Sequence, residues 1–175
     1  MQPLEIRIDD GAWNQCGKVV KTYTHYDINS RNLNIVGDLI FVEDKYSKSH
    51  RGAVRGFHGD NHTWKLVTCL NGLIYLAVID ARRSSQTYRK TWTYTLCEEK
   101  NNQILIPPGF VNAHQSLKDD SLFFYKQTSY YMGTKAQVTV NPLSFSWPIK
   151  DIIVSDRDRS AGEFDSIDIE SLGKA

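Results

Sequence analysis

The run KLVTCLNGLIYLAVID, residues 65–80, contains two apolar stretches separated by Asn71-Gly72. Both stretches have the length and the apolar character of β-strands. Asn-Gly between two such stretches is the strongest short signal of a β-hairpin, because both residues tolerate the positive φ of a type I′ turn. The run therefore predicts strands at 65–70 and 73–80, paired with each other.

Similar signals occur along most of the chain. Further strands are expected at residues 34–42, 90–97, 103–106, 114–117, 121–129 and 137–140, and helical character is expected only in the tail after Ser155. Short strands at this spacing, with turn signals between them, are typical of a sandwich or barrel. No linker or repeat divides the 175 residues. We therefore expect a single all-β domain over 1–175, with short peripheral helical segments.

Composition narrows the classes of function. Apolar residues make up 41% and charged residues 23% of the chain, and the net charge is +1. Scattered Lys and Arg argue against nucleic acid or an anionic membrane as a partner. The N-terminus has no apolar segment typical of a signal peptide, and no apolar run reaches the roughly 20 residues of a transmembrane helix. Cys16, Cys69 and Cys97 lack metal-ligand spacing. We expect reduced thiols and a cytoplasmic protein.

A possible metal motif lies in VRGFHGDNHTWK, residues 54–65. His58 and His62 resemble the two histidines of the first cupin motif, in which a glutamate ligand precedes a glycine by seven positions. Counting back from Gly72 reaches Lys65, whose charge repels a divalent ion. The second motif, PPGFVN at 107–112, ends in Asn112 where cupins have histidine. The sequence therefore predicts a cupin-like jelly-roll β-barrel without a metal.

Charged residues around His58 suggest another use of the barrel. Arg55, His58 and Lys65 can converge on one pocket, and this set suits a phosphorylated substrate whose reaction builds negative charge on oxygen. The structural alternatives are a satisfied core histidine and a solvated strand lysine. A carboxylate paired with His58 would fix its tautomer, and Asp158 is a candidate. The alternative for Asp158 is an exposed turn.

The aromatic run FFYKQTSYY, residues 123–131, offers a general acid. On a strand, Phe124 would pack in the core, and Tyr125 would face the barrel interior. A tyrosine there can protonate a carbanion-like centre, and a nearby cation can lower its pKa. Tyr130 and Tyr131 could stack on a base or a sugar. Core packing is the alternative for all of these rings.

Several segments together resemble the dTDP-4-dehydrorhamnose 3,5-epimerase family between about Phe41 and Arg159. They are SHRGAVRGFH at 49–58, KLV at 65–67, IPPGF at 106–110, YKQTSYY at 125–131, WP at 147–148 and SDRD at 155–158. The resemblance implies a jelly-roll barrel that needs no cofactor, in a homodimer whose N-terminal strands cross to the partner. It places His58 as catalytic base, Tyr125 as acid on the opposite face, Asp158 as the carboxylate that orients His58, and Lys65 beside the enolate oxygen.

The same resemblance implies the substrate-binding residues, which are Arg55, Arg51, Lys45, Asn112, His114 and Tyr131. The chain departs from the family at Glu43-Asp44-Lys45, where Gln-Asp-Asn is usual, and at Asn112, where histidine is usual. The N-terminal Phe-x-Asp-x-Arg-Gly pattern is not recognisable in residues 26–31. The HGD at 58–60 and NAH at 112–114 look more like a subgroup that acts on GDP-4-keto-heptoses.

We therefore expect a nucleotide-sugar epimerase that inverts C3, C5 or both of a GDP- or dTDP-linked 4-keto-6-deoxy sugar, in capsule or lipopolysaccharide biosynthesis. A 4-keto group acidifies the hydrogens on C3 and C5, and a base and an acid on opposite faces of the ring invert a carbon. Two alternatives remain, a nucleotide-sugar 3,4-ketoisomerase and a non-catalytic sugar-binding cupin. Lys65 and Asn112 argue against a metal-dependent cupin oxygenase.

Overall fold

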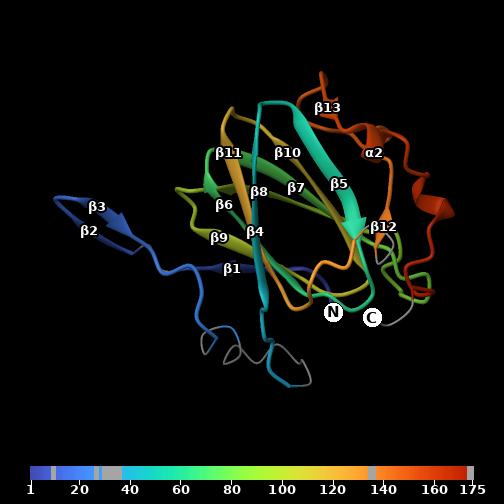
Figure 1. Ribbon diagram of the computed structural model, residues 1–175, viewed down its shortest axis with the longest axis horizontal. Coiled ribbons are helices and arrows are strands. Elements are labelled where there is room, and N and C mark those ends of the chain that lie inside the picture. Colours follow the sequence, from blue (N-terminus) through green and yellow to red (C-terminus); the bar gives the residue numbers. More distant parts are fainter. Residues whose placement is uncertain (9–10, 26–27, 29–36, 134–136, 173–175) are drawn as a thin grey trace.

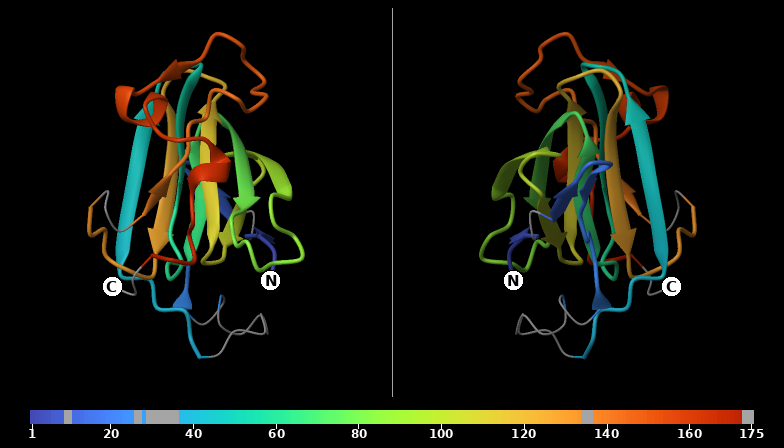
Figure 2. Two further views of the ribbon diagram at one scale, coloured as in Figure 1. Left: turned by 90° about the vertical axis from the view of Figure 1, so that its right-hand side faces the viewer. Right: turned by 90° about the vertical axis from the view of Figure 1, so that its left-hand side faces the viewer.

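Two β-sheets face each other in the computed structural model, which describes residues 1–8, 11–25, 28, 37–133 and 137–172 (Figures 1 and 2). The first sheet runs in the order β1 (Leu4–Arg7), β9 (Asn102–Ile106), β6 (Lys65–Asn71), β11 (Ser121–Gln127) and β4 (Glu43–Ser49). The second runs in the order β12 (Val138–Thr139), β5 (Ala53–Gly59), β10 (Phe110–Ser116), β7 (Leu73–Asp80) and β8 (Thr91–Cys97), and β13 (Ile153–Val154) lies parallel to β5.

The remaining elements are small and peripheral. Strands β2 (Ala12–Asn14) and β3 (Gly17–Val19) form a hairpin that stands away from the two sheets (Figure 1). The tail contains the short helix α2 (Asp156–Arg159) and the 3₁₀ turn η2 (Phe164–Ser166). The predicted all-β fold with helical segments in the tail is confirmed. In the described part of the chain, no helix is long and apolar enough to span a membrane.

Apolar residues pack in three layers, because alternate residues of a strand face opposite sides of its sheet. Val67, Ile74, Leu76 and Phe123 belong to the cluster between the two sheets. A second cluster covers the outer face of β5, β10 and β7 with residues of the C-terminal segment, including Trp147. The third cluster covers the outer face of the first sheet. The cluster between the sheets is made mainly by β6, β7, β9 and part of β11, which leaves the side of β4 and β5 open for a site.

Two hydrogen bonds attach the C-terminal segment to β10. The fully buried side chain of Gln115 donates from Nε2 to Ile149 O at 2.9 Å, and its Oε1 accepts from Ile149 N at 2.9 Å. Trp147 packs beside them, and its indole Nε1 donates to Pro142 O at 2.9 Å. These contacts place the start of α2 next to β5, where the site lies.

The Asn71-Gly72 turn corrects the hairpin prediction. Both predicted strands exist, but β6 pairs with β9 and β11, whereas β7 pairs with β10 and β8. Gly72 has φ +86° and crosses from one sheet to the other, in contact with Ser121. The positive φ that makes Asn-Gly a hairpin signal serves equally well in a crossing turn. Local sequence therefore identified the turn and not the partners of the strands.

The predicted strand at 34–42 is also wrong in its described part. Residues 34–36 lie outside the described residues, residues 37–42 form no strand, and β4 begins at Glu43. Leu39 and Phe41 instead pack against the outer face of the first sheet. Ile40 and Val42 between and after them are exposed, so the apolar run at 39–42 reflects one-sided packing rather than strand pairing. The prediction at 114–117 began late, since β10 starts at Phe110.

Replacement of Gly72 by alanine tests the crossing turn. A Cβ there would lie 2.5 Å from Ser121 Oγ and 2.9 Å from Ser121 Cα. We expect Gly72→Ala to lower the free energy of unfolding by about 2–4 kcal/mol through strain and overpacking. Gly37 is the matched control, because its φ is +80° and no described atom lies within 4 Å of the added Cβ. Gly37→Ala should cost about 1 kcal/mol. Equal losses in urea unfolding would contradict the packing role.

Candidate active site

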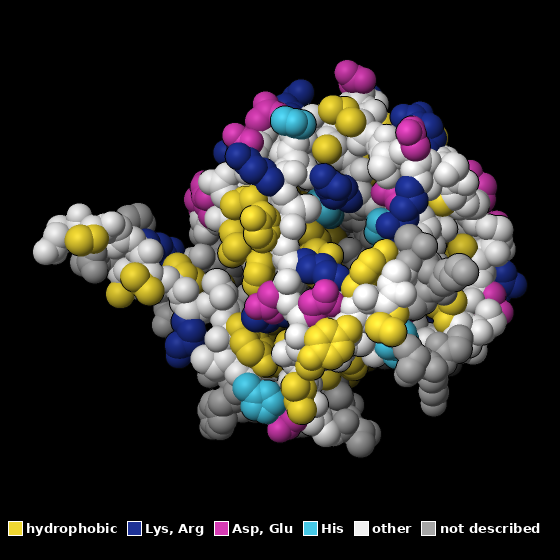
Figure 3. Space-filling model, viewed as in Figure 1, with side chains coloured by type: hydrophobic (Ala, Val, Ile, Leu, Met, Phe, Trp, Pro, Cys, Tyr) yellow, Lys and Arg dark blue, Asp and Glu magenta, His cyan; other side chains and the backbone are white. Residues whose placement is uncertain are grey.

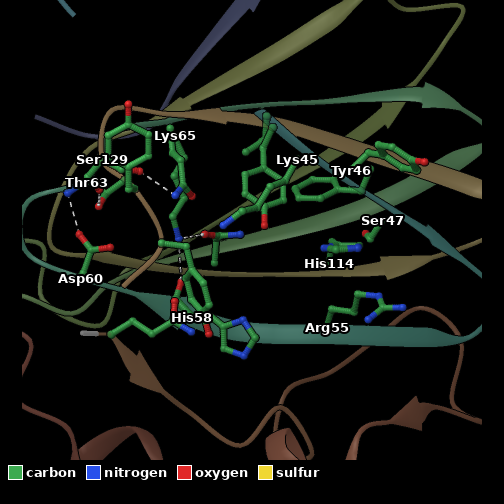
Figure 4. Close-up of a pocket in the computed structure, with 18 of the residues that line it drawn as sticks. Lys45, Tyr46, Ser47, Arg55, His58, Asp60, Thr63, Lys65, His114 and Ser129 are labelled. Carbon is green, nitrogen blue, oxygen red and sulfur yellow. Dashed lines mark hydrogen bonds between the residues drawn. The ribbon is translucent and has the colours of Figure 1, made fainter. Parts of the chain in front are cut away.

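A cavity of about 630 Å³ opens between β4, β11 and β6 of one sheet and β5 and β10 of the other. Figure 3 shows the hollow, with Lys, Arg and His side chains around it. Figure 4 shows the side chains that point into it from both sheets. The cavity therefore has cations, imidazoles and aromatic rings within reach of one ligand.

All of the predicted site residues except Arg51 line this cavity. Those that line it are Lys45, Arg55, His58, Lys65, Asn112, His114, Tyr125, Tyr131 and Asp158. Arg51 is exposed in the turn between β4 and β5, and its backbone N–H donates to Asp119 Oδ1 at 2.8 Å. The structure therefore does not bring Arg51 together with the others.

A bulge in β5 aims Arg55 and His58 into the same cavity. Residues three apart on a regular strand face opposite sides. Across β5 and β10, however, His58 is opposite Asn112 and Arg55 is opposite His114, so β5 has one extra residue. Such a bulge changes the direction in which later side chains point. At Gly56, φ is +111°, and a Cβ would lie 2.5 Å from Asn112 O, so glycine is required.

His58 is paired with Asp158. The two residues are 100 positions apart, and His58 Nε2 lies 2.7 Å from Asp158 Oδ1. The other carboxylate oxygen, Oδ2, accepts from Gly56 N at 3.2 Å. Ser155 caps α2, since its Oγ accepts from Asp158 N at 3.2 Å. With Nε2–H donated to the carboxylate, Nδ1 is the nitrogen of the neutral ring that can accept a proton.

Burial and the nearby cations keep His58 neutral near pH 7. Burial lowers its pKa most, and the nearby charges of Arg157 and Lys65 lower it further. The hydrogen bond and the charge of Asp158 act in the opposite direction without cancelling them. For Asp158, burial raises the pKa, but the contacts with His58, Gly56 and Arg157 hold it below the usual value. The pair is therefore a neutral imidazole beside a carboxylate.

Lys65 lies on β6 beside this pair. Its Nζ donates to Asn112 Oδ1 at 3.2 Å and lies 3.4 Å from His58 O (Figure 4). Burial lowers its pKa, and the negative charge of Asp60 partly offsets that effect. Within the described residues, this buried ammonium is held by neutral oxygens and has no counterion at hydrogen-bond distance. It is therefore suited to stabilise an anion that forms in the cavity.

Tyr125 enters the cavity from β11, on the sheet that faces His58. Burial raises its pKa, Glu43 and Tyr131 raise it further, and Arg55 opposes them. The expectation that a cation lowers this pKa is therefore wrong, because burial outweighs Arg55. A phenol that keeps its proton is nevertheless what a proton donor requires. The inward aromatic neighbour that joins the core is Phe123, and not Phe124 as expected.

Glu43 organises one rim of the cavity. Its carboxylate accepts from Lys45 Nζ at 2.9 Å, from Gln127 Nε2 at 2.7 Å and from Tyr131 N at 2.7 Å. Lys45 Nζ also lies 4.3 Å from the centre of the Tyr131 ring. These contacts hold the segment after β11 against β4. They leave an aromatic ring and a cation side by side at the entrance.

Sequence reasoning missed several residues of the cavity wall. Examples are Ser47, Asp60, His62, Thr63, Gln127 and Arg157. The signal for Ser47 and Gln127 was available, since each lies two positions from a predicted residue on the same strand, Lys45 and Tyr125. Arg157 lies within the SDRD segment at 155–158, but no role was predicted for it. Among the described residues, no three His, Cys, Asp or Glu side chains are grouped as a metal site would require.

Comparisons with known proteins agree on one family. The family model described as dTDP-4-dehydrorhamnose 3,5-epimerase matches residues 10–166. The dTDP-4-dehydrorhamnose 3,5-epimerase of Shigella flexneri is 31% identical over 130 residues, which are 71% of this chain and 72% of that enzyme. The one from Pseudomonas aeruginosa is 31% identical over 134 residues, which are 73% and 74% of the two chains.

A solved structure shows the same likeness. The dTDP-6-deoxy-D-glucose-3,5-epimerase of Legionella pneumophila, in complex with dTDP-4-keto-L-rhamnose, superposes with a TM-score of 0.86 at 26% identity. The match covers 99% of this chain and 93% of that one. The epimerase of Sulfolobus tokodaii gives a TM-score of 0.85 at 25% identity, over 95% and 93% of the chains.

Replacement of Asp158 tests the pair. Because Asp158 raises the pKa of His58, Asp158→Asn should lower that pKa further, and the ring should stay neutral to a lower pH. An NMR titration of the His58 ring measures the shift. Asp156 lies exposed on the same helix, and Asp156→Asn is the control that should leave the His58 titration unchanged. An unchanged or raised His58 pKa in Asp158→Asn would show that the carboxylate does not act on the ring.

Proposed function

Because this chain belongs to the dTDP-4-dehydrorhamnose 3,5-epimerase family, we propose that it inverts C3, C5 or both of a nucleotide-linked 4-keto-6-deoxy sugar. The observation that supports this reaction best is the His58–Asp158 pair on one sheet, with Tyr125 on the sheet that faces it. Inversion requires a base on one face of the carbon and an acid on the other. The cavity supplies both.

His58 begins the reaction by removing a proton from the carbon next to the ketone. Nδ1 takes the proton, and Asp158 stabilises the imidazolium that forms. The electron pair moves onto the C4 oxygen, and the Lys65 ammonium stabilises the enolate. The proton that Tyr125 then donates enters from the opposite face. Solvent exchange returns a proton to Tyr125 and removes one from His58, so the enzyme ends as it began.

The diphosphate and the base bind at the rim. Arg55, Lys45 and Arg157 supply positive charge around the entrance, and Tyr131 supplies a ring on which a base can stack. The relatives and the Legionella structure are named for dTDP sugars. Lys45, Asn112 and His114, which all line the cavity, depart from the family pattern. We therefore keep both dTDP- and GDP-linked sugars as substrates to be tested.

We also propose a cytoplasmic homodimer in which residues 1–175 of each chain form a single domain, acting in surface polysaccharide synthesis. The β2–β3 hairpin supports the dimer, because it stands away from both sheets of its own chain (Figure 1). In the described chain, its strands pair only with each other. A projecting hairpin with unpaired edges is stabilised when another chain covers it.

Deuterium uptake tests the base. Dissolved in D₂O with GDP- and dTDP-linked 4-keto sugars, the protein should raise the substrate mass by one unit for each carbon exchanged. His58→Asn should slow this uptake by about 10²–10⁴-fold, since that is the usual contribution of a general base. His50 is the control, because its side chain is 85% exposed in a turn, and His50→Asn should retain full uptake. Persistent exchange in His58→Asn would reject the assignment.

The role of Tyr125 as the proton donor leads to a separate prediction. Tyr125→Phe should slow inversion more than it slows deprotonation, because His58 remains in place. Deuterium uptake measures deprotonation, and NMR of the reduced product measures inversion. Tyr94→Phe on β8, whose hydroxyl lies 3.4 Å from Pro3 O outside the cavity, is the control. Equal losses of uptake and inversion in Tyr125→Phe would contradict the assignment of base and acid to opposite faces.

A further inference from the structure

One end of the cavity contains two buried polar atoms without partners. Of the buried side-chain nitrogen and oxygen atoms that lack a hydrogen bond within the described chain, only Ser47 Oγ and His114 Nε2 belong to residues that line the cavity. A buried polar atom without a partner destabilises the folded state, so few of them are found in native proteins. Two unpaired polar atoms in the wall of one cavity indicate that a bound ligand supplies their hydrogen-bond partners.

The two residues lie on opposite sheets and share one neighbour. The His114 ring, on β10, stacks on Phe123 with a centroid distance of 4.0 Å and an interplanar angle of 20°. Ser47, on β4, is the cross-strand partner of Phe123. Figure 4 shows both side chains in the cavity wall, with Arg55 near them. Arg55 is the cross-strand partner of His114, and its Nε donates to Ser49 Oγ at 3.0 Å.

This end of the cavity is separate from the reacting groups. His114 lies two residues along β10 from Asn112, which is a distance of about 7 Å. Asn112 accepts the hydrogen bond from Lys65, so the enolate oxygen belongs at that position. A sugar ring with its ketone at Lys65 can therefore direct another substituent toward Ser47 and His114.

The chemistry of the pair favours an uncharged oxygen. Burial and the charges of Arg55 and His58 lower the pKa of His114 to about 3, so its ring is neutral at physiological pH. A neutral imidazole and a serine hydroxyl each offer one donor and an acceptor. A hydroxyl group is the ligand that both donates and accepts. A phosphate would use only the donors of the pair, and its charge would be met by Arg55 beside the pair and by Lys45 and Arg157.

Both side chains can turn toward a ligand at small cost. Rotation about χ1 moves the Ser47 hydroxyl between staggered positions. A half-turn of the His114 ring about its Cβ–Cγ bond keeps the ring in the plane that stacks on Phe123 and exchanges the positions of carbon and nitrogen atoms. The stacking therefore holds the ring in the wall without deciding which edge it presents.

We propose that Ser47 and His114 form a hydroxyl-binding subsite, which selects nucleotide sugars that carry a hydroxyl group away from the reacting carbons. This inference rests on the proposed function, which places the ketone at Lys65. It adds a specificity determinant on the far side of the sugar from the enolate oxygen. Substrates that lack this hydroxyl leave both polar atoms without partners and should be used poorly.

Three variants test the subsite in steady-state kinetics and thermal unfolding. His114→Phe keeps an aromatic ring against Phe123, and Ser47→Ala removes one oxygen atom. Each should raise KM by about 5- to 50-fold with little loss of kcat, and should leave the melting temperature unchanged or higher. Ser116→Ala is the matched control, because Ser116 Oγ is buried and unpaired within the described chain but lies outside the cavity. It should leave KM unchanged. Unchanged KM in both His114→Phe and Ser47→Ala would overturn the subsite.

A binding experiment separates this inference from the catalytic one. Protein labelled with ¹⁵N-histidine is titrated with dTDP, dTDP-glucose, GDP and GDP-mannose, none of which has a 4-keto group to react. The His114 signal, assigned by its loss in His114→Phe, should shift with a nucleotide sugar and not with the diphosphate alone. An equal shift with dTDP or GDP alone would show that His114 responds to the phosphates and would reject the subsite. No shift with either nucleotide sugar would also reject it. Failure of deuterium uptake in the wild-type protein would instead reject the proposed function.

Discussion

The hydrogen bonds to Asp158 join the end of the chain to the strand that forms the cavity wall. One carboxylate oxygen accepts from His58 and the other from the backbone of Gly56, so the pair depends on the bulge that Gly56 permits in β5. The carboxylate in turn depends on the C-terminal segment, which Gln115 and Trp147 hold on the outer face of the second sheet. The site therefore exists only when both faces of that sheet are packed.

The same packing sets the protonation states inside the cavity. Burial lowers the pKa values of His58, Lys65 and His114 and raises that of Tyr125. Each shift favours the uncharged form of the group. A cavity of this kind contains a neutral base and a protonated phenol, and it makes the appearance of an anion next to Lys65 favourable. His58 and Tyr125 are therefore already in the protonation states that proton transfer requires before the substrate reacts.

The cavity also separates recognition from chemistry. Glu43, Lys45 and Tyr131 form an ordered rim at one side, whereas Ser47 and His114 lie at the other end beside Phe123. His58, Lys65 and Tyr125 lie in the cavity wall on three different strands, and Tyr125 is directly opposite Lys45 across β11 and β4. Because the recognition groups are on other positions of the same strands, they can change without disturbing the reacting groups. Departures from the family pattern at Lys45, Asn112 and His114 fall around the reacting groups rather than on His58, Lys65 or Tyr125.

Sequence alone determined the class of fold and most of the residues of the site. Short apolar stretches separated by turn signals predicted β6, β7, β9 and β11, and β8 was predicted by its alternation of polar and apolar residues. The facing of side chains on a strand also placed Lys65 and Tyr125 inside the barrel. Family resemblance supplied the roles of His58 and Asp158, and it implied a substrate contact for Arg51, which does not line the cavity.

Only the tertiary structure decided which strands pair and how the side chains work together. Gly72 has a positive φ in this crossing between sheets, as it would in a hairpin turn, so the Asn-Gly sequence could not exclude the wrong pairing. The bulge that aligns Arg55 with His58 and the 100-residue contact between His58 and Asp158 depend on packing between distant segments. The pKa of Tyr125 rises because burial outweighs the nearby cation, and burial is a property of the assembled barrel rather than of any stretch of sequence.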